Sequence, residues 1–386
     1  MSNPKKIPFS KVHVGEAERR YLNEVLDSGW LTTAGKTLEF EKRFAEHIGV
    51  KFACAVNSCT AALHLGIDAL GIQAGDKVLI PSMTFTATAE VVRYLNAEII
   101  LVDTEYSTNL MTPEIVSEAL ERHPDIKLII VVHYGGQAAR IDEIASICKE
   151  KGVKLMEDAA HAFPTKYKDK YIGNFGDITC FSFYANKTIT TGEGGMLVTD
   201  DEAIYKRVKT MRLHGINRDI WDRFTSNKPS WEYDVIEAGY KYNMPDLAAA
   251  IGLGQLEKAE ELRLERQKAV EFYYNSLADI PSITLPICHD KYEDHAWHLF
   301  PIILKPSAKL TRNEFIEQLA ALGIGTSVHY KPIHQLKYYL ERYNLSAKDY
   351  PNTEATWQGT VSLPLYPYME EADLKFVSSA IHSLLL

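Results

Sequence analysis

The sequence predicts an α/β protein built on a mainly parallel β-sheet with helices on both faces. Short, almost continuously apolar runs alternate with amphipathic helical stretches through the first two-thirds of the 386 residues. Strands that are buried on both faces have this composition, and the helices between them provide the crossovers. Apolar residues make up 46% of the chain and charged residues 24%, which is typical of a globular protein. The length exceeds that of one average domain, so one large and one smaller domain are expected.

Six apolar runs are predicted to be buried strands, at 77–85, 97–104, 127–136, 153–160, 178–185 and 194–200. A seventh strand-like run, KFACAV, precedes them at 51–56. Helices are expected near 60–70, 86–95, 112–122 and 140–151. Ligands of such sheets bind beyond the carboxyl ends of the strands, so the polar residues that follow these runs are the first candidates for a site.

The last third of the chain predicts a smaller α+β unit. A long helical stretch follows Pro245 and leads into it. Strands are expected at 297–304, 325–330 and 362–367, with helices near 311–322 and 370–385. The predicted boundary divides the chain into a large domain, residues 1–255, and a small domain, residues 256–386.

Charge and cysteine content exclude several classes of protein. The net charge is −9 and the basic residues are scattered, which argues against a nucleic-acid-binding protein. The five cysteines form no CxxC pair, as expected for thiols that pack as small hydrophobic residues in a reducing compartment, and no metal site is predicted. The N-terminus lacks a signal-peptide core and no run approaches a membrane span, so a cytoplasmic protein without a membrane partner is expected.

The segment 181–200, FSFYANKTITTGEGGMLVTD, places Lys187 between a predicted strand and a glycine-rich loop. Most lysines are solvated surface residues, and that is the alternative here. An apolar, partly desolvated setting instead makes the neutral amine available as a nucleophile. The apolar FSF run before Lys187 favours this second interpretation.

The run KLMEDAAHAF, at 154–163, carries Asp158 at a predicted strand end, with His161 shortly after it. Asp158 could cap a helix, and a lone histidine could be an ordinary half-buried residue. Together with Lys187, however, these residues supply an amine, a carboxylate and an imidazole. The lysine can form a Schiff base with pyridoxal phosphate and the carboxylate can keep the pyridine nitrogen protonated, so the combination predicts a pyridoxal phosphate site.

A phosphate site is predicted at residues 57–71, where Asn57 and Ser58 end a strand-like run and Thr60 opens a helix. Unpaired backbone N–H groups and the helix dipole favour a dianionic phosphate there, although an ordinary helix cap would give the same pattern. The GxGxxG and GxxxxGK[ST] motifs of dinucleotide and P-loop sites are missing from the expected contexts. Phe85 could stack on a flat cofactor ring or pack in the core.

Several motifs, in order over most of the chain, resemble those of the DegT/DnrJ/EryC1/StrS family of nucleotide-sugar aminotransferases. They are SGWLTTAGKTLEFEKRFAEHIG, NSCTAALHL, PSMTFTATAE, EDAAHA, FSFYANKTITTGEGGMLVT, GYKYNM and VHYKPIH. The resemblance implies fold type I of the pyridoxal phosphate-dependent transferases, with a mostly parallel seven-stranded sheet. The segments HAWHLF and GIGTSVHY resemble the branch that acts on UDP-4-keto sugars, such as the UDP-4-amino-4-deoxy-L-arabinose aminotransferases.

The resemblance also implies a role for individual residues. Lys187 would be the Schiff-base lysine, Asp158 the partner of the pyridine nitrogen, and His161 a neighbour of the phenolic oxygen. Further cofactor contacts are implied for Cys59 (through its backbone), Thr60, Phe85, Ser182 and Asn243. Substrate contacts are implied for Thr32, Gly35, Tyr184, His329 and Tyr330. Asn243 would reach the phosphate of a neighbouring subunit, which implies a homodimer with shared sites.

The activity implied by the resemblance is a transamination in two halves. L-Glutamate would give its amino group to the cofactor and leave as 2-oxoglutarate, and the cofactor would then aminate the ketone of a nucleotide-linked 4-keto sugar. Lys187 would move the proton in each half. A dehydratase branch of the family has histidine in place of this lysine, so the lysine favours amino transfer. Amination of a 3-keto sugar, an amino-acid lyase and a non-catalytic regulator with the same fold stay as alternatives.

Overall fold

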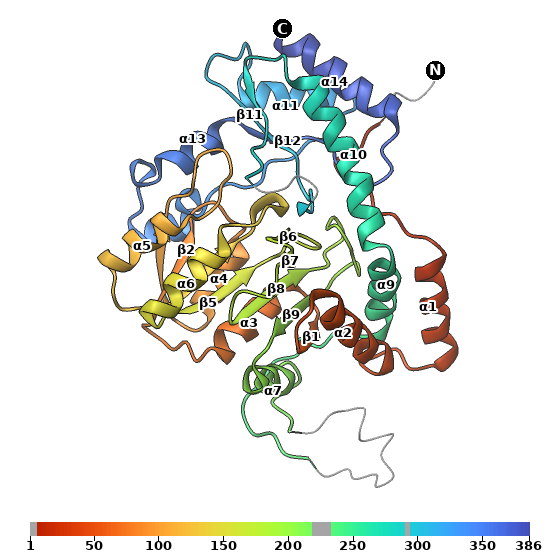
Figure 1. The fold of residues 1–386 in the computed structure, drawn as a ribbon, viewed down its shortest axis with the longest axis vertical. Helices are drawn as coiled ribbons and strands as arrows, with labels where there is room; N and C mark the ends of the chain where they lie inside the picture. The colour runs from red at the N-terminus through yellow and green to blue at the C-terminus, as the bar shows by residue number, and fades with distance from the viewer. Residues whose placement is uncertain (1–5, 218–232, 290–293) are drawn as a thin grey trace.

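The computed structural model describes residues 6–217, 233–289 and 294–386 and confirms the α/β fold class (Figure 1). Its main element is a seven-stranded sheet in the order β1-β9-β8-β5-β4-β2-β3. The pairs that β9 makes with β1 and β8 are antiparallel, and the other neighbouring pairs are parallel. The sheet is therefore mostly parallel, as expected, and all of its strands except β9 end along a common edge.

The strands of this sheet overlap the predicted apolar runs. They are β1 (Phe52–Val56), β2 (Lys77–Pro81), β3 (Glu98–Val102), β4 (Ile126–Val132), β5 (Lys154–Asp158), β8 (Ile178–Ser182) and β9 (Gly195–Thr199). The helices predicted between them are confirmed as α3 (Cys59–Ala69), α4 (Thr86–Tyr94), α5 (Pro113–Arg122) and α6 (Ile141–Lys151). A short hairpin, β6 (Lys166–Tyr167) with β7 (Lys170–Tyr171), and α7 (Glu202–Met211) complete this region.

Side chains along each strand alternate between two buried cores, one on each face of the sheet. In β4, Ile129 and Val131 belong to one cluster and Leu128 and Ile130 to the other, as the two-residue period of a strand requires. Helices α3, α4 and α7 cover the second cluster. The first is covered by α1 (Glu16–Ser28), α2 (Gly35–Ile48), α5, α6 and α9 (Asp246–Glu257).

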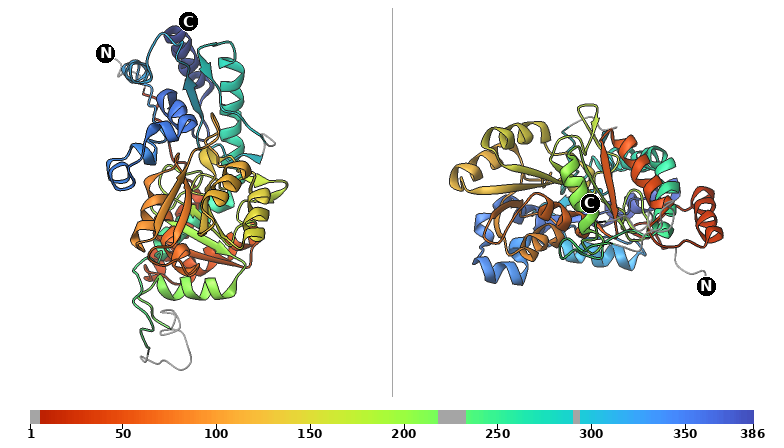
Figure 2. Two further views of the ribbon diagram at one scale, coloured as in Figure 1. Left: turned by 90° about the vertical axis from the view of Figure 1, so that its left-hand side faces the viewer. Right: turned by 90° about the horizontal axis from the view of Figure 1, so that it is seen from below.

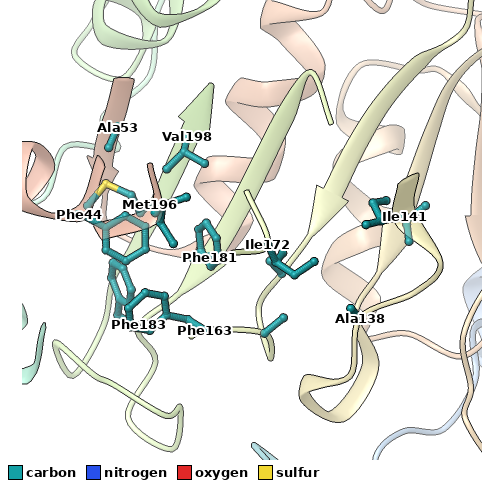
Figure 3. Close-up of a cluster of buried hydrophobic side chains, with 14 of the residues drawn as sticks. Phe44, Ala53, Ala138, Ile141, Phe163, Ile172, Phe181, Phe183, Met196 and Val198 are labelled. Carbon is teal, nitrogen blue, oxygen red and sulfur yellow. The ribbon is translucent and has the colours of Figure 1, made fainter. Parts of the chain in front are cut away.

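Aromatic packing dominates the first cluster where α2 meets the middle of the sheet (Figure 3). The ring of Phe44 on α2 lies 5.0 Å from Phe163, 5.2 Å from Phe181 and 5.6 Å from Phe183, measured between centroids. Phe181 belongs to β8, and Phe183 begins the loop that carries Lys187. The core therefore fixes both the strand and the start of the loop on which the predicted site depends.

The C-terminal third forms a second, smaller layer of structure at the end of the molecule away from α7 (Figures 1 and 2). It contains α10 (Ala259–Leu277), α11 (Arg312–Ala321), α12 (Lys337–Tyr343), α13 (Pro351–Gly359) and α14 (Glu371–Leu385). An antiparallel sheet of β10 (Ile283–Thr284), β11 (Pro301–Leu304) and β12 (Thr360–Ser362) packs with α10, α11 and α14 around a third buried cluster. The boundary between residues 255 and 256 stays a prediction.

The strands predicted in this region are shorter than expected. Only the second half of 297–304 is a strand, because Leu299 donates its N–H to Gly135 O at 3.1 Å and so contacts a turn of the large sheet region instead. The run 362–367 leaves the sheet after Ser362, and two of its next five residues are prolines, which have no N–H for a strand ladder.

Two other expectations are corrected. The strand predicted at 325–330 was wrong, since this segment makes only one bridge, between Ser327 and Ser362. Its next backbone contacts go to the loop after β2: Tyr330 N donates to Met83 Sδ at 3.5 Å. The long helix expected after Pro245 is two helices, α9 and α10, which meet at Lys258. Among the described helices, none is both long enough and apolar enough to cross a bilayer.

Candidate active site

A cavity of about 430 Å³ lies beyond the carboxyl ends of β1, β5 and β8, where the sequence places the site. It is lined by most of the predicted residues: Cys59, Thr60, Phe85, Asp158, His161, Ser182, Tyr184, Lys187, His329 and Tyr330. These residues come from segments far apart in the sequence. The fold brings them together, while their individual roles stay predictions.

Lys187 lies in the loop between β8 and β9, and its side chain is half-buried. Its backbone N–H donates to Tyr184 O at 2.9 Å, which fixes a turn immediately after the strand. Burial lowers the pKa of the Lys187 ammonium from 10.5 to about 8, and the neighbouring Cys59 and Asp158 side chains oppose that shift. A lysine in this state supplies much more neutral amine near pH 7 than an exposed lysine.

Asp158 is the last residue of β5 and is 5% exposed. Its Oδ2 accepts a hydrogen bond from Thr88 Oγ1 at 2.8 Å, and its Oδ1 accepts one from Ala160 N at 3.2 Å. Burial raises the pKa of the Asp158 carboxyl group, whereas these hydrogen bonds and the positive charge of Lys187 lower it. Burial outweighs the other influences, so the pKa stays above its usual value, and a cation that enters the cavity would stabilise the carboxylate form.

His161 is buried at the same side of the cavity. Gly135 N donates to its Nδ1 at 3.2 Å, so the ring proton belongs on Nε2, which lies 2.8 Å from Tyr330 Oη. Burial lowers the pKa of His161 well below its usual value, and the nearby charge of Lys187 lowers it further. A neutral imidazole that donates toward Tyr330 can hold an aromatic hydroxyl or oxygen in place without adding charge.

The N-terminus of α3 forms a phosphate-sized cradle. Ser58 is the N-cap and its Oγ accepts Ala61 N at 3.1 Å, so the N–H groups of Cys59 and Thr60 begin the helix at the cavity wall. A Cβ on Gly195, the first residue of β9, would lie 2.5 Å from Ser58 C and 2.6 Å from Cys59 N. Glycine at this position lets the sheet approach the helix start closely enough to shape the cradle.

The cavity also contains an unsatisfied acceptor. Among the described residues, Asn186 Oδ1 is buried and has no hydrogen-bond partner. Within the described parts of the chain, Ser182 Oγ, at the end of β8, accepts one contact, from Tyr184 N at 3.3 Å. The residues present therefore fit a flat, phosphorylated cofactor: a nucleophilic amine, a buried carboxylate, a helix N-terminus and polar groups that lack strong partners.

The segment that carries His329 and Tyr330 is held in place by buried hydrogen bonds of His334, which the sequence did not indicate. His334 Nδ1 lies 2.6 Å from Ser82 Oγ in the loop after β2, and His334 Nε2 lies 3.0 Å from Glu354 Oε2 on α13. Ser82 and His334 are both 0% exposed. Ser82 is inaccessible and therefore cannot act as a nucleophile. The hydrogen bonds of His334 to Ser82 and Glu354 instead hold the segment in place.

Tyr330 and His329 then close one side of the cavity. The Tyr330 ring lies 5.4 Å from the Phe85 ring, measured between centroids, and Phe85 is largely exposed at the mouth. His329 Nδ1 lies 2.9 Å from Ser362 Oγ, and burial lowers the pKa of its imidazole to about 4. An aromatic wall of this kind suits a planar ring.

Three predicted residues do not line the described cavity: Thr32, Gly35 and Asn243. The turn before α2 is tied instead to the segment 243–246, where Asn243 Nδ2 donates to Thr33 Oγ1 at 2.6 Å and Asp246 N donates to Thr32 O at 3.3 Å. Their predicted contacts with a nucleotide and with a neighbouring subunit are not tested within one chain.

The residues that sequence reasoning missed are Thr88, behind Asp158, and the pair Ser82 and His334. Thr88 lies in the first turn of a predicted helix, but Thr84 falls in the predicted strand 77–85, so the sequence did not indicate that the two side chains meet. The Ser82–His334 contact had no sequence signal either, because its members are separated by 252 positions in the sequence.

A mostly parallel sheet, with a lysine, a carboxylate and a helix N-terminus around one cavity beyond its strands, defines a pyridoxal phosphate-dependent transferase. The comparisons with known proteins agree and give the family. The chain belongs to the DegT/DnrJ/EryC1/StrS aminotransferase family, which it matches over residues 12–382.

Individual relatives match over nearly their full length. The chain is 40% identical over 380 residues to the spore coat polysaccharide biosynthesis protein SpsC of Bacillus subtilis, covering 98% of this chain and 97% of that protein. The putative sugar aminotransferase Spr1654 from Streptococcus pneumoniae, in its PMP form, has a TM-score of 0.90 at 29% identity and covers 98% of both chains. PseC of Helicobacter pylori, an aminotransferase involved in the biosynthesis of pseudoaminic acid, has a TM-score of 0.90 at 26% identity and covers 99% of both chains.

The Streptococcus pneumoniae protein is also similar in its PLP form, with a TM-score of 0.89. The predicted fold type, the aminotransferase class and the cofactor are thereby confirmed, and pyridoxal phosphate is the cofactor of this enzyme. The more specific resemblance to UDP-4-amino-4-deoxy-L-arabinose aminotransferases stays a prediction.

Proposed function

We propose that the enzyme transfers the amino group of L-glutamate to the ketone of a nucleotide-linked 4-keto sugar, with UDP as the nucleotide. The observation that carries the proposal is the placement of Lys187 and Asp158 on one cavity, with burial lowering the pKa of the Lys187 amine to about 8. When bound, pyridoxal phosphate supplies an electron sink that stabilises negative charge at the carbon losing its proton.

Lys187 has two tasks in this proposal. Its amine would hold the cofactor before the amino donor arrives, and the free amine would then be the group that takes up and returns the substrate proton. A proton carrier works best when its pKa is near the working pH. The pKa of about 8 that burial gives Lys187 meets this requirement.

Asp158 would hold the protonated ring nitrogen, and the other groups would orient the ring. The buried carboxylate already accepts two hydrogen bonds and has further acceptor capacity for a cation. His161 would face the phenolic side of the ring, and Phe85 would cover one ring face. Electrostatic stabilisation of the developing charge by a fixed ion pair is expected to be the largest single contribution to the rate.

The phosphate would bind at the start of α3. The N–H groups of Cys59 and Thr60, the Thr60 hydroxyl and the Ser182 hydroxyl are the donors available there. A helix N-terminus favours a dianion through its dipole and its unpaired N–H groups. We further propose that Asn243 completes this site in a second subunit, so that the active form is a homodimer in the cytoplasm.

The sugar nucleotide would enter past Tyr184, His329 and Tyr330, with the Thr32–Gly35 turn near its diphosphate. Support for a nucleotide-linked 4-keto sugar comes from the resemblance of the HAWHLF and GIGTSVHY segments. It also fits relatives named for polysaccharide and pseudoaminic acid biosynthesis. Amination at the 3-position is the competing proposal within the same family.

A panel assay tests the proposal. Purified enzyme is incubated with L-glutamate and, separately, UDP-4-keto and TDP-3-keto sugars, and the products are identified by mass spectrometry. We expect a 4-amino product and equimolar 2-oxoglutarate, and no product with Lys187→Ala. Exclusive amination of 3-keto sugars would reject the 4-keto assignment, and product from Lys187→Ala would reject the role of the lysine.

A further inference from the structure

Two buried threonine hydroxyls stand in series behind the Asp158 carboxylate. Thr88 Oγ1 donates to Asp158 Oδ2 at 2.8 Å, and Thr84 Oγ1 lies 2.7 Å from Thr88 Oγ1. A hydroxyl group has one hydrogen to donate. When Thr88 gives its hydrogen to Asp158, Thr84 must therefore donate to Thr88, and the three groups form a directed chain.

The chain is part of the start of α4. Phe85 is the N-cap, so Thr88 lies in the first turn and Thr84 directly precedes the cap. The first turn is the positive end of the helix dipole, which favours a negative charge on the carboxylate that Thr88 contacts. Thr84 and Thr88 are 1% and 0% exposed; Thr84 reaches the cavity wall, whereas Thr88 lies behind it.

The charge state of Asp158 depends on a balance of opposing influences. Burial raises its pKa, and the Thr88 hydrogen bond is the largest influence that lowers it, ahead of Ala160 N and the charges of Lys187 and His133. Three further titratable groups interact electrostatically with Asp158: Cys59, Cys180 and Tyr330. Without the Thr88 hydroxyl, the balance moves toward the neutral acid, which cannot pair with a protonated ring nitrogen.

We infer that Thr88, supported by Thr84, is a positioning residue that keeps the Asp158 carboxylate ionised and oriented for the ring nitrogen of the cofactor. The inference rests on the proposed pairing of Asp158 with that nitrogen. Thr88 is not among the described residues that line the cavity, so it acts through Asp158 and touches neither cofactor nor substrate.

Three variants separate this role from general packing. Thr88→Val removes the hydroxyl and keeps the branched shape, and Thr88→Ser keeps the hydroxyl. Thr104→Val is the matched control, because Thr104 Oγ1 and Thr353 Oγ1 form another buried hydroxyl pair, at 2.9 Å, away from the cavity. If Thr88→Val does not fold, Thr88→Ala replaces it with the same expectations.

The first readout is the affinity of the cofactor-free protein for pyridoxal phosphate. Hydrogen bonds to charged groups contribute enough that Thr88→Val should weaken binding roughly 10- to 100-fold. Thr88→Ser and Thr104→Val should stay within about threefold of wild type. A cofactor analogue with carbon in place of the ring nitrogen should bind wild type and Thr88→Val equally, since it offers no nitrogen to pair with Asp158.

The second readout is the ¹⁵N chemical shift of ring-labelled cofactor. We expect a protonated nitrogen in wild type, Thr88→Ser and Thr104→Val, and a shift toward the unprotonated form in Thr88→Val. The inference would be overturned if Thr88→Val kept the wild-type ¹⁵N chemical shift and pyridoxal phosphate affinity. It would also be overturned if Thr88→Val bound the carbon analogue more weakly by the same factor as pyridoxal phosphate. Neither readout needs a sugar, so a wild type with protonated nitrogen that aminates no sugar would reject only the proposed function.

Discussion

Capture of pyridoxal phosphate by the cofactor-free protein should be fast near neutral pH and should level off near pH 8. Burial lowers the pKa of Lys187 from 10.5 to about 8. At pH 7 the neutral fraction of the amine is then roughly 10%, against roughly 0.03% for a lysine with the ordinary pKa. Because only the neutral amine attacks an aldehyde, the expected advantage over an exposed lysine is roughly 300-fold at pH 7.

The assay is stopped-flow absorbance on protein stripped of cofactor, over about pH 6 to 10, with N-acetyl-lysine as the exposed comparison amine. The protein rate should rise about tenfold per pH unit up to the pKa and then become flat, while the comparison rate continues to rise. The Asp158 carboxylate favours the ammonium form of Lys187, so Asp158→Asn should move the midpoint to lower pH. A protein rate that rises in parallel with the comparison amine through pH 10 would refute a buried, activated lysine.

Three further predictions follow from the site. Asp158→Asn should weaken the cofactor at least as much as Thr88→Val does and, with pyridoxal phosphate at saturating concentration, lower kcat roughly 10²- to 10³-fold in steady-state assays, and unchanged kinetics would exclude a role for the ion pair. Gly195→Ala should lower the free energy of unfolding in urea by about 1–3 kcal/mol and weaken cofactor binding, because the new Cβ meets the backbone at the start of α3. Wild-type stability and cofactor affinity would contradict the proposed phosphate site. His334→Ala should lower the free energy of unfolding by about 1–3 kcal/mol and raise KM for the sugar, with cofactor affinity unchanged. The reason is that the segment bearing Tyr330 loses its hydrogen bonds to Ser82 and Glu354. A loss of cofactor affinity as large as the rise in KM would show a different role.

The large sheet could be predicted from the sequence because its strands are apolar on both faces. Runs such as 127–136 are buried from either side, so composition alone identifies them. The same reasoning failed at 325–330, which is also rich in strand-forming residues. There the backbone bonds to the loop after β2 and lines a cavity, and a composition rule contains no information on such contacts.

The site was predictable where chemistry and position coincide in one short segment. Asp158 ends the apolar strand β5, Lys187 lies in the loop after the apolar strand β8, and these two strands are neighbours in the sheet. The residues that support Lys187 and Asp158 were harder to predict from the sequence. Thr88 reaches Asp158 across 70 positions and His334 reaches Ser82 across 252, and only the folded chain shows such pairs.

The most direct test of the central claim is to locate the bond between enzyme and cofactor. Protein loaded with pyridoxal phosphate is reduced with borohydride, digested and mapped by mass spectrometry. We predict a single modified peptide, with the added mass on Lys187. An adduct on another lysine, or no adduct in protein that has bound the cofactor, would contradict the claim.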